Sequence, residues 1–191
     1  MELQHLDLKL PVAGAERVPP QAFIPVFHDW VRAQDREELL IDVADYSHVP
    51  DGPGIILIGH EADYSMDDSG GHSGLRYNRK GVLSGSNRQR LGQALRALVG
   101  AAQQLEDTPA LSGRLVFSRR EVALAVNDRL LAPNLPETFA EAEPELLEFF
   151  RPLLGDDVLI LYRQGDPRER FSVSVTAQKP FDLFAITSAL S

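Results

Sequence analysis

The stretch LIGHEADYSMDDSGGHSGLRYNRKG, residues 57–81, runs from apolar residues through acids and a glycine-rich turn to basic residues. The pattern predicts a long strand over GIILIGHEADY (54–64), a turn at DDSGGHSG and a returning strand over LRYNRK (75–80). Acids of the first strand then face bases of the second, and such cross-strand pairs stabilise a hairpin and set its register. The stretch therefore predicts a charge-registered antiparallel hairpin.

The same stretch contains a candidate site at its first histidine. Side chains alternate along a strand, so His60 shares the face of Ile56 and Ile58, whereas Glu61 lies on the opposite face. The two side chains cannot then bind one metal ion together. His60 is expected either to bond a loop carbonyl or to act as a ligand or catalytic group at the strand end.

Upstream of the hairpin, three further elements are expected. Residues 3–10 alternate in hydropathy, which predicts a half-buried strand with its leucines inward. Residues 19–34 repeat apolar side chains at spacings of three and four, which predicts a helix in which Pro25 is poorly placed. Residues 39–45 are expected to form a strand.

Downstream of the hairpin, helices and hairpins alternate. A helix is predicted after Ser84 or Ser86, with an apolar face that includes Leu91, Leu95 and Leu98. Residues 113–129 and 157–177 are expected to form hairpins, separated by a helix over 136–154 that Pro144 divides. Ser172, Ser174 and Thr176 form a small polar face that either meets water or pairs with a second copy at a sheet edge. The C-terminal residues 181–190 are expected to pack as a strand or short turn.

Short turns between adjacent strands imply antiparallel pairing, and helices over such a sheet give an α+β fold. We predict a single-domain α+β sandwich over residues 1–191. It comprises a mainly antiparallel sheet with about three helices, built as repeated helix–hairpin units. If the chain divides into two half-domains, the join falls at residues 106–113.

Composition limits the function. The 191-residue chain has no cysteine, which excludes disulfides, thiolate metal sites and cysteine nucleophiles. It shows no secretory leader and no apolar run long enough to span a membrane, so a soluble cytoplasmic protein is expected. A net charge of −9 repels phosphate backbones, so neither nucleic acid nor membrane is an expected partner.

Several motifs are absent from the sequence: a phosphate-binding loop, an H-E-x-x-H helix, a G-x-S-x-G elbow and a calcium-loop register. Histidines and carboxylates nevertheless cluster in the first third of the chain. The ends of strands 39–45 and 54–64 would carry His60, His48, Asp45 and Glu61. Such groups support acid/base or metal-assisted chemistry.

A basic segment spans residues 76–96, and no acid occurs between residues 69 and 104. Its arginines near a helix start predict an anion site at Arg76, Arg79, Arg88 and Arg90. The alternative is that its first part only forms ion pairs with the acidic strand.

Three functions follow from these patterns. The first is a small soluble binding or accessory module that self-associates as a homodimer. The second is a hydrolase or isomerase with the histidine–carboxylate site. The third is an anion- or nucleotide-sensing regulatory module that uses residues 76–96. The sequence indicates no particular cofactor.

Overall fold

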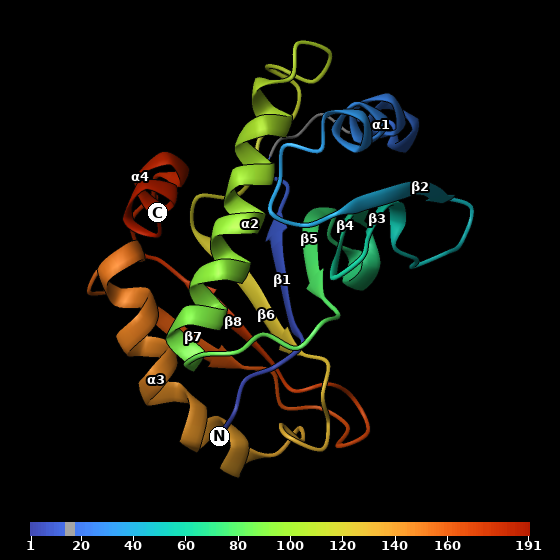
Figure 1. The fold of residues 1–191 in the computed structure, drawn as a ribbon. Helices are drawn as coiled ribbons and strands as arrows, with labels where there is room; N and C mark the ends of the chain where they lie inside the picture. The colour runs from blue at the N-terminus through green and yellow to red at the C-terminus, as the bar shows by residue number, and fades with distance from the viewer. Residues whose placement is uncertain (14–17) are drawn as a thin grey trace.

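Antiparallel strands form one continuous eight-stranded sheet in the computed structural model, which describes residues 1–13 and 18–191 (Figure 1). The strand order is β2-β3-β4-β5-β1-β6-β8-β7, so the N-terminal strand lies inside the sheet. The strands are β1 (Leu6–Pro11), β2 (Leu40–Tyr46), β3 (Gly54–Gly59), β4 (Ala62–Asp67), β5 (Gly74–Arg79), β6 (Glu121–Val126), β7 (Leu159–Tyr162) and β8 (Ser172–Thr176).

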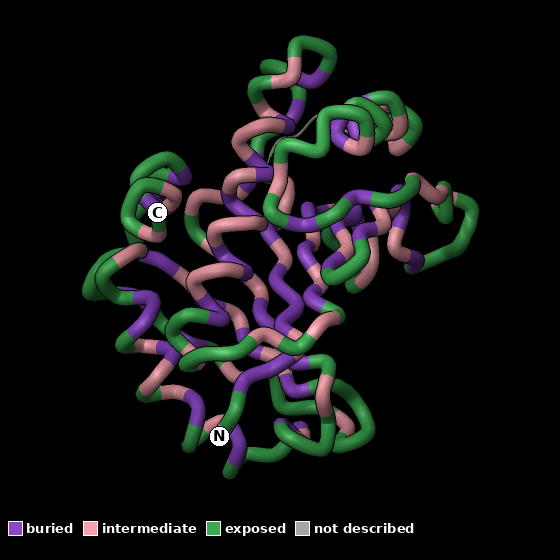
Figure 2. Tube along the Cα trace, in the orientation of Figure 1, coloured by how far each residue is buried: buried purple, intermediate pink, exposed green. Residues whose placement is uncertain are grey.

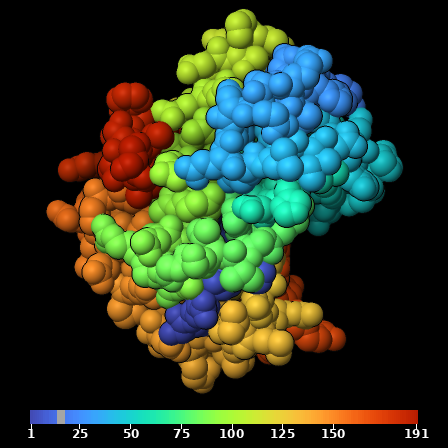
Figure 3. Space-filling model, in the orientation of Figure 1, coloured from blue at the N-terminus to red at the C-terminus, as the bar shows by residue number. Residues whose placement is uncertain are grey.

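Helices cover one face of this sheet (Figures 1 and 3). They are α1 (Phe23–Ala33), α2 (Asn87–Asp107), α3 (Pro136–Leu154) and α4 (Leu183–Ala189). α1 packs on β2 and β3, α2 on β1 and β5, and α3 on β7, while α4 fills the angle between α2 and α3. The arrangement confirms the α+β class, with four helices in the described residues where about three were expected. No helix of the described chain is long and apolar enough to cross a membrane.

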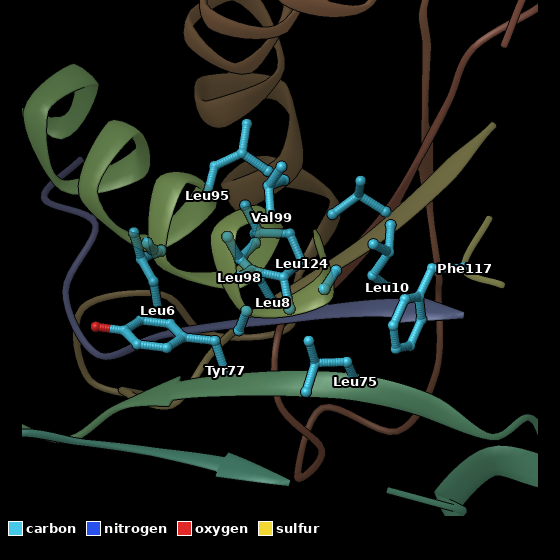
Figure 4. Close-up of a cluster of buried hydrophobic side chains, with 14 of the residues drawn as sticks. Leu6, Leu8, Leu10, Leu75, Tyr77, Leu95, Leu98, Val99, Phe117 and Leu124 are labelled. Atoms are coloured by element: carbon cyan, nitrogen blue, oxygen red, sulfur yellow. The ribbon is translucent and has the colours of Figure 1, made fainter. Parts of the chain in front are cut away.

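β1 joins the two parts of the sheet, because β5 pairs with one of its edges and β6 with the other. Leu8 lies opposite both Tyr77 and Leu124. The predicted alternation is confirmed, since Leu6 and Leu10 are buried with Leu8 beneath α2 (Figure 4). The residues between these leucines project from the opposite, helix-free face. β1 therefore contributes to the core and to the open face at once.

α2 begins where the sequence predicted. Ser86 accepts a hydrogen bond from the Gln89 amide, and the Gln89 side chain accepts one from the Ser86 amide, which completes a capping box. The predicted apolar face is buried against β1 and β5 (Figures 2 and 4). Its fully buried members include Leu91, Leu95, Leu98, Ala102 and Leu105.

The long strand predicted over 54–64 is wrong, because the chain reverses within it. β3 ends at Gly59, and β4 starts at Ala62 and pairs back on β3. A side chain at Gly59 would place its Cβ 2.3 Å from the Ala62 carbonyl oxygen, so the tight turn requires glycine. His60 and Glu61 therefore lie in an exposed turn, and the parity that separated them on one strand does not apply.

Two helix predictions also need correction. α3 runs unbroken through Pro144, which is exposed, so water can reach the carbonyl that proline leaves unbonded. Burial of the apolar face of α3, including Phe149 and Phe150, holds the helix together. The C-terminal segment is helix α4 rather than a strand or turn, and the Asp182 side chain caps it by accepting a bond from the Phe184 amide.

Pairing in the C-terminal half is partly as expected. β7 and β8 form the predicted hairpin, with Val173 and Val175 buried. The hairpin predicted over 113–129 is wrong, because β6 pairs with β1 and β8, while Phe117 reaches the sheet only through a bridge to Val12. β8 lies between β6 and β7, so the Ser172–Thr176 face is not at a sheet edge.

Truncation of the α2 core should measurably weaken the fold. Leu98 is fully buried, so Leu98→Ala is expected to lower the free energy of unfolding by about 3 kcal/mol through lost burial and a residual cavity. Urea denaturation checks this. Arg88→Ala, at an exposed site on the same helix, is the control and should change stability by less than about 0.5 kcal/mol. Equal effects of the two variants would contradict the packing described.

Candidate functional site

The structure does not bring the predicted histidine–carboxylate residues together. β2 and β3 are antiparallel, with Leu40 opposite Gly59 and Tyr46 opposite Gly54. His60 and Glu61 therefore lie at one end of this strand pair, and Asp45 and His48 at the other. These ends are about 15–20 Å apart by strand length.

Asp45, His48 and Glu61 have local side-chain contacts instead, and the backbone amide of His60 donates to the Leu39 carbonyl at 2.8 Å. The side chain of Asp45 accepts bonds from the Ser47 hydroxyl and amide, which lower its pKa. The ring of His48 stacks on Tyr46, with 6.4 Å between centroids. Glu61 forms an ion pair with Arg79. Within residues 1–13 and 18–191, no three histidine, aspartate or glutamate side chains are grouped to hold a metal ion.

The four predicted anion-binding arginines are also dispersed. Arg90 is buried and donates to Glu2, to the Leu83 carbonyl and to Asn87, so its guanidinium is already bonded. Arg88 is exposed on α2, whose N-terminus is occupied by its own capping box. Arg79 donates to Glu61 and to a backbone carbonyl.

The alternative interpretation of the basic segment is confirmed. Ion pairs join the β5 side to the β4 side: Lys80 with Asp63 at 2.7 Å, Arg79 with Glu61 at 3.0 Å and Arg76 with Asp67 at 3.0 Å. Of the eight residues predicted as sites, Arg76 alone also joins a charged cluster on the open face of the sheet.

That cluster surrounds a hollow of about 420 Å³ above β1, β6 and β8, which we call the central hollow. Glu121 of β6 lines this hollow and accepts a hydrogen bond from the Ser174 hydroxyl at 2.7 Å. The rest of its floor consists of small side chains that β6 and β8 present to the open face. They are Ala123, Ala125, Ser172 and Ser174. Charged side chains from β1 and β5 and from the segment before β8 rise around this floor.

Asp7 organises the charged wall. Its carboxylate is nearly buried, with 5% of the side chain exposed, although it belongs to the helix-free face. The Arg76 Nε donates to both of its oxygens, at 2.8 and 2.9 Å, and the Arg170 Nη1 donates to one, at 2.5 Å. Burial lowers the pKa of Arg76, but bonds and charge from Asp7 and Asp67 outweigh it and raise the pKa. Asp7 thus fixes two guanidinium groups beside the hollow.

A second buried carboxylate, that of Asp67, also bonds the cations of this wall. Asp67 is fully buried and accepts bonds from Lys9 Nζ at 2.6 Å and from Arg76 Nη1 at 3.0 Å. It also accepts bonds from the hydroxyl and amide of Ser69. Lys9 and Arg76 lie directly opposite each other on β1 and β5, and Asp67 separates their like charges.

Two loops extend the site beyond the N-terminal end of β8. The loop of residues 127–135 meets the loop of residues 163–171, since Arg129 donates to the Arg168 carbonyl at 2.7 Å and Pro133 bridges Arg170 (Figure 1). Between them lies the loop hollow, of about 570 Å³, lined by Arg129, Arg163, Arg168 and Arg170 among others. The Arg163 guanidinium makes no hydrogen bond or ion pair with any described residue.

A third hollow, of about 690 Å³, continues past Asn127 and Arg129 toward the start of β1. We call it the His5 hollow, and Arg79, Lys80 and Leu130 also line it. Among the described residues, eight cationic side chains but only four carboxylates line the three hollows. Four further carboxylates form ion pairs with these cations, so acids and bases balance here, whereas the whole chain has 19 cations and 28 acids; they are Glu61, Asp63, Asp67 and Asp166.

Another buried polar cluster lies on the helix face. Glu38 accepts bonds from the hydroxyls of Tyr64 and Tyr77, at 3.1 and 2.9 Å, and from Gln93 at 3.0 Å. These bonds tie the segment before β2 to the sheet and to α2. The cluster thereby anchors the fold, whereas the arginines of the open face adjoin space for a ligand.

Sequence reasoning missed Asp7, Arg163 and Arg170. One signal was available, because Asp7 alternates with buried leucines and a charged group in an interior strand needs a partner. That β1 is interior is a property of long-range pairing, which its local pattern does not reveal. Comparison with family models, with curated proteins and with solved structures finds no match to the chain.

Removing the carboxylate that organises the wall should destabilise the protein. Asp7→Ala leaves Arg170 without its carboxylate and Arg76 with only Asp67, so we expect the free energy of unfolding to fall by about 2–3 kcal/mol. Urea denaturation at neutral pH measures this. Asp107→Ala, at an exposed position after the α2 core, should leave stability nearly unchanged. An Asp7→Ala protein as stable as the parent would argue against the cluster.

Acid should weaken the fold partly through Asp67. Burial raises the pKa of this carboxyl, but bonds from Lys9 and Ser69 and the charges of Lys9 and Arg76 lower it below its ordinary value of 3.8. Ionised Asp67 therefore stabilises the fold above about pH 4, and this contribution is lost as the pH falls below that value. Asp67→Asn should lower stability at pH 7, yet lose less between pH 5 and pH 2.5 than the parent. Urea denaturation of both proteins at pH 7, pH 5 and pH 2.5 tests this. Equal losses of stability in the parent and in Asp67→Asn between pH 5 and pH 2.5 would contradict it.

Proposed function

We propose that the protein is a binding module that captures anionic ligands on the open face of its sheet. The observation that carries the proposal is the guanidinium of Arg163, which pairs with no residue that the structure describes and lines the loop hollow together with Arg170, which Asp7 holds in place. Guanidinium groups present forks of donors that match carboxylate and phosphate oxygens. A ligand anion at the junction of the central and loop hollows would meet both arginines.

Preorganisation supports recognition at this point. Asp7 and Asp67 accept hydrogen bonds from Arg76 and Lys9, so these cations of the wall are held in place before any ligand arrives. Arg170 shares Asp7 with Arg76, so the two carboxylates of the wall do not neutralise its three cations. An arriving anion would supply the missing negative charge without a large ordering cost.

The proposal gives the predicted binding module a ligand class and a location. It retains the anion specificity considered for residues 76–96, but of the four arginines predicted there only Arg76 lines the central hollow. Self-association as a homodimer, a cytoplasmic location and the hydrolase or isomerase alternative stay predictions that the described contacts do not address.

Citrate, a tricarboxylate, is a suitable probe for this proposal. Isothermal titration at low salt should detect binding to the parent protein, and added sodium chloride should weaken it by screening. Arg163→Ala should reduce affinity about tenfold, the effect of losing one charge-assisted hydrogen bond of ~1.4 kcal/mol. Arg88→Ala, which removes an exposed arginine from α2, is the matched control and should bind like the parent.

Two outcomes would contradict the proposal. One is the absence of citrate binding to folded parent protein at low salt. The other is equal loss of affinity in Arg163→Ala and Arg88→Ala, which would indicate a diffuse charge effect in place of a site.

A further inference from the structure

We infer that the anionic ligand is an extended acidic peptide of about six residues, a deduction that rests on the proposed function. The three hollows adjoin one another along the open face, and we treat them as one groove. The central and loop hollows share four lining residues, including Arg163 and Arg170, and the loop and His5 hollows share Asn127 and Arg129.

The length of the groove follows from β1. Pro11 lines the far end of the central hollow and His5 lines the third hollow, so the groove follows the whole strand. Six residue steps in extended conformation span about 20 Å. An extended peptide of about six residues matches this length, whereas a phosphate ion or a small di-acid fills a quarter of it.

The lining of the groove favours a peptide over a nucleic acid. Among its described lining residues the groove has no phenylalanine, tyrosine or tryptophan on which a base could stack. Its floor of alanines and serines lets an extended main chain approach the sheet closely. Arginine is also its commonest cation, and the guanidinium fork pairs with single carboxylates in a bidentate manner.

An apolar contact lies at one end of the groove. Leu130 is 96% exposed and lies beside Arg129 at the rim of the His5 hollow. Its exposure is maintained by the loop, since Asp128 accepts bonds from the amides of Leu130 and Leu131, at 3.0 and 3.1 Å. A peptide that combines acids with a terminal leucine would gain contact here as well as charge pairing.

Blocked glutamate peptides of two, four, six and eight residues test the inference by isothermal titration against the intact protein. Affinity should rise at least tenfold from two to six residues and change little from six to eight. A leucine added at one terminus of the hexapeptide should strengthen binding, and Leu130→Asp should abolish that gain.

Variants at the two ends separate this inference from the proposed function. Lys80→Ala, in the His5 hollow, should weaken the binding of hexaglutamate severalfold. The same variant should leave the binding of citrate unchanged, because citrate reaches only the Arg163–Arg170 region. Arg163→Ala should weaken the binding of both citrate and hexaglutamate. Arg88→Ala should affect neither.

Four results would overturn the peptide inference while leaving anion binding intact. The first is equal affinity for diglutamate and hexaglutamate. The second and third are binding of a thymidine hexanucleotide, or of anionic lipid vesicles, that is tighter than binding of hexaglutamate. The fourth is a dimer, seen by sedimentation of the parent protein, that Arg163→Glu dissociates. The last would assign the groove to a second copy of the chain. Failure of every anion to bind would overturn the proposed function itself.

Discussion

The rest of the structure depends on the pairing of β1 with strands on both of its edges. β5 closes a meander that begins at β2, and β6 begins the group that ends at β7, so these parts share a sheet only through β1. One strand therefore has to satisfy two sets of neighbours. Its leucines fill the core under α2, while Asp7 and Lys9 form the charged wall of the open face. The six residues of β1 therefore contribute to both the core and the proposed site.

Local patterns were sufficient for elements whose environment repeats along the chain. The alternation of Leu6, Leu8 and Leu10, and the Ser86 cap before an apolar helix face, are examples that the structure confirms. Where such patterns gave a wrong prediction, the error can be traced to a single residue. Gly59 turned an expected strand into two, and Pro144 did not interrupt α3, because tertiary packing outweighed the local preference.

The site was harder to predict than the fold. Its residues come from β1, β5 and two loops, and only the register of long-range strand pairs brings them together. The histidines and carboxylates near residues 45–61 suggest a site because they are neighbours in sequence, yet antiparallel pairing of β2 and β3 separates them. Arg163 and Arg170 sit in a polar loop that has no distinctive motif. Their proximity to Asp7, more than 150 positions earlier, is invisible to any local pattern.

The interior position of β1 also has a consequence for biosynthesis. Of the described strands β1 is translated first, yet it lies between two strands that are translated much later, β5 and then β6. The meander from β2 to β5 consists of sequential neighbours and can form as it emerges. β1 can add to that meander once β5 is complete, but its second edge then stays unpaired until residue 126 has been made. An exposed strand edge is a template for unwanted pairing, and the charges of Asp7 and Lys9 sit on the strand that bears it. Charged residues of this kind disfavour edge-to-edge pairing, so two side chains of the proposed site are also of the type that blunts an exposed strand edge.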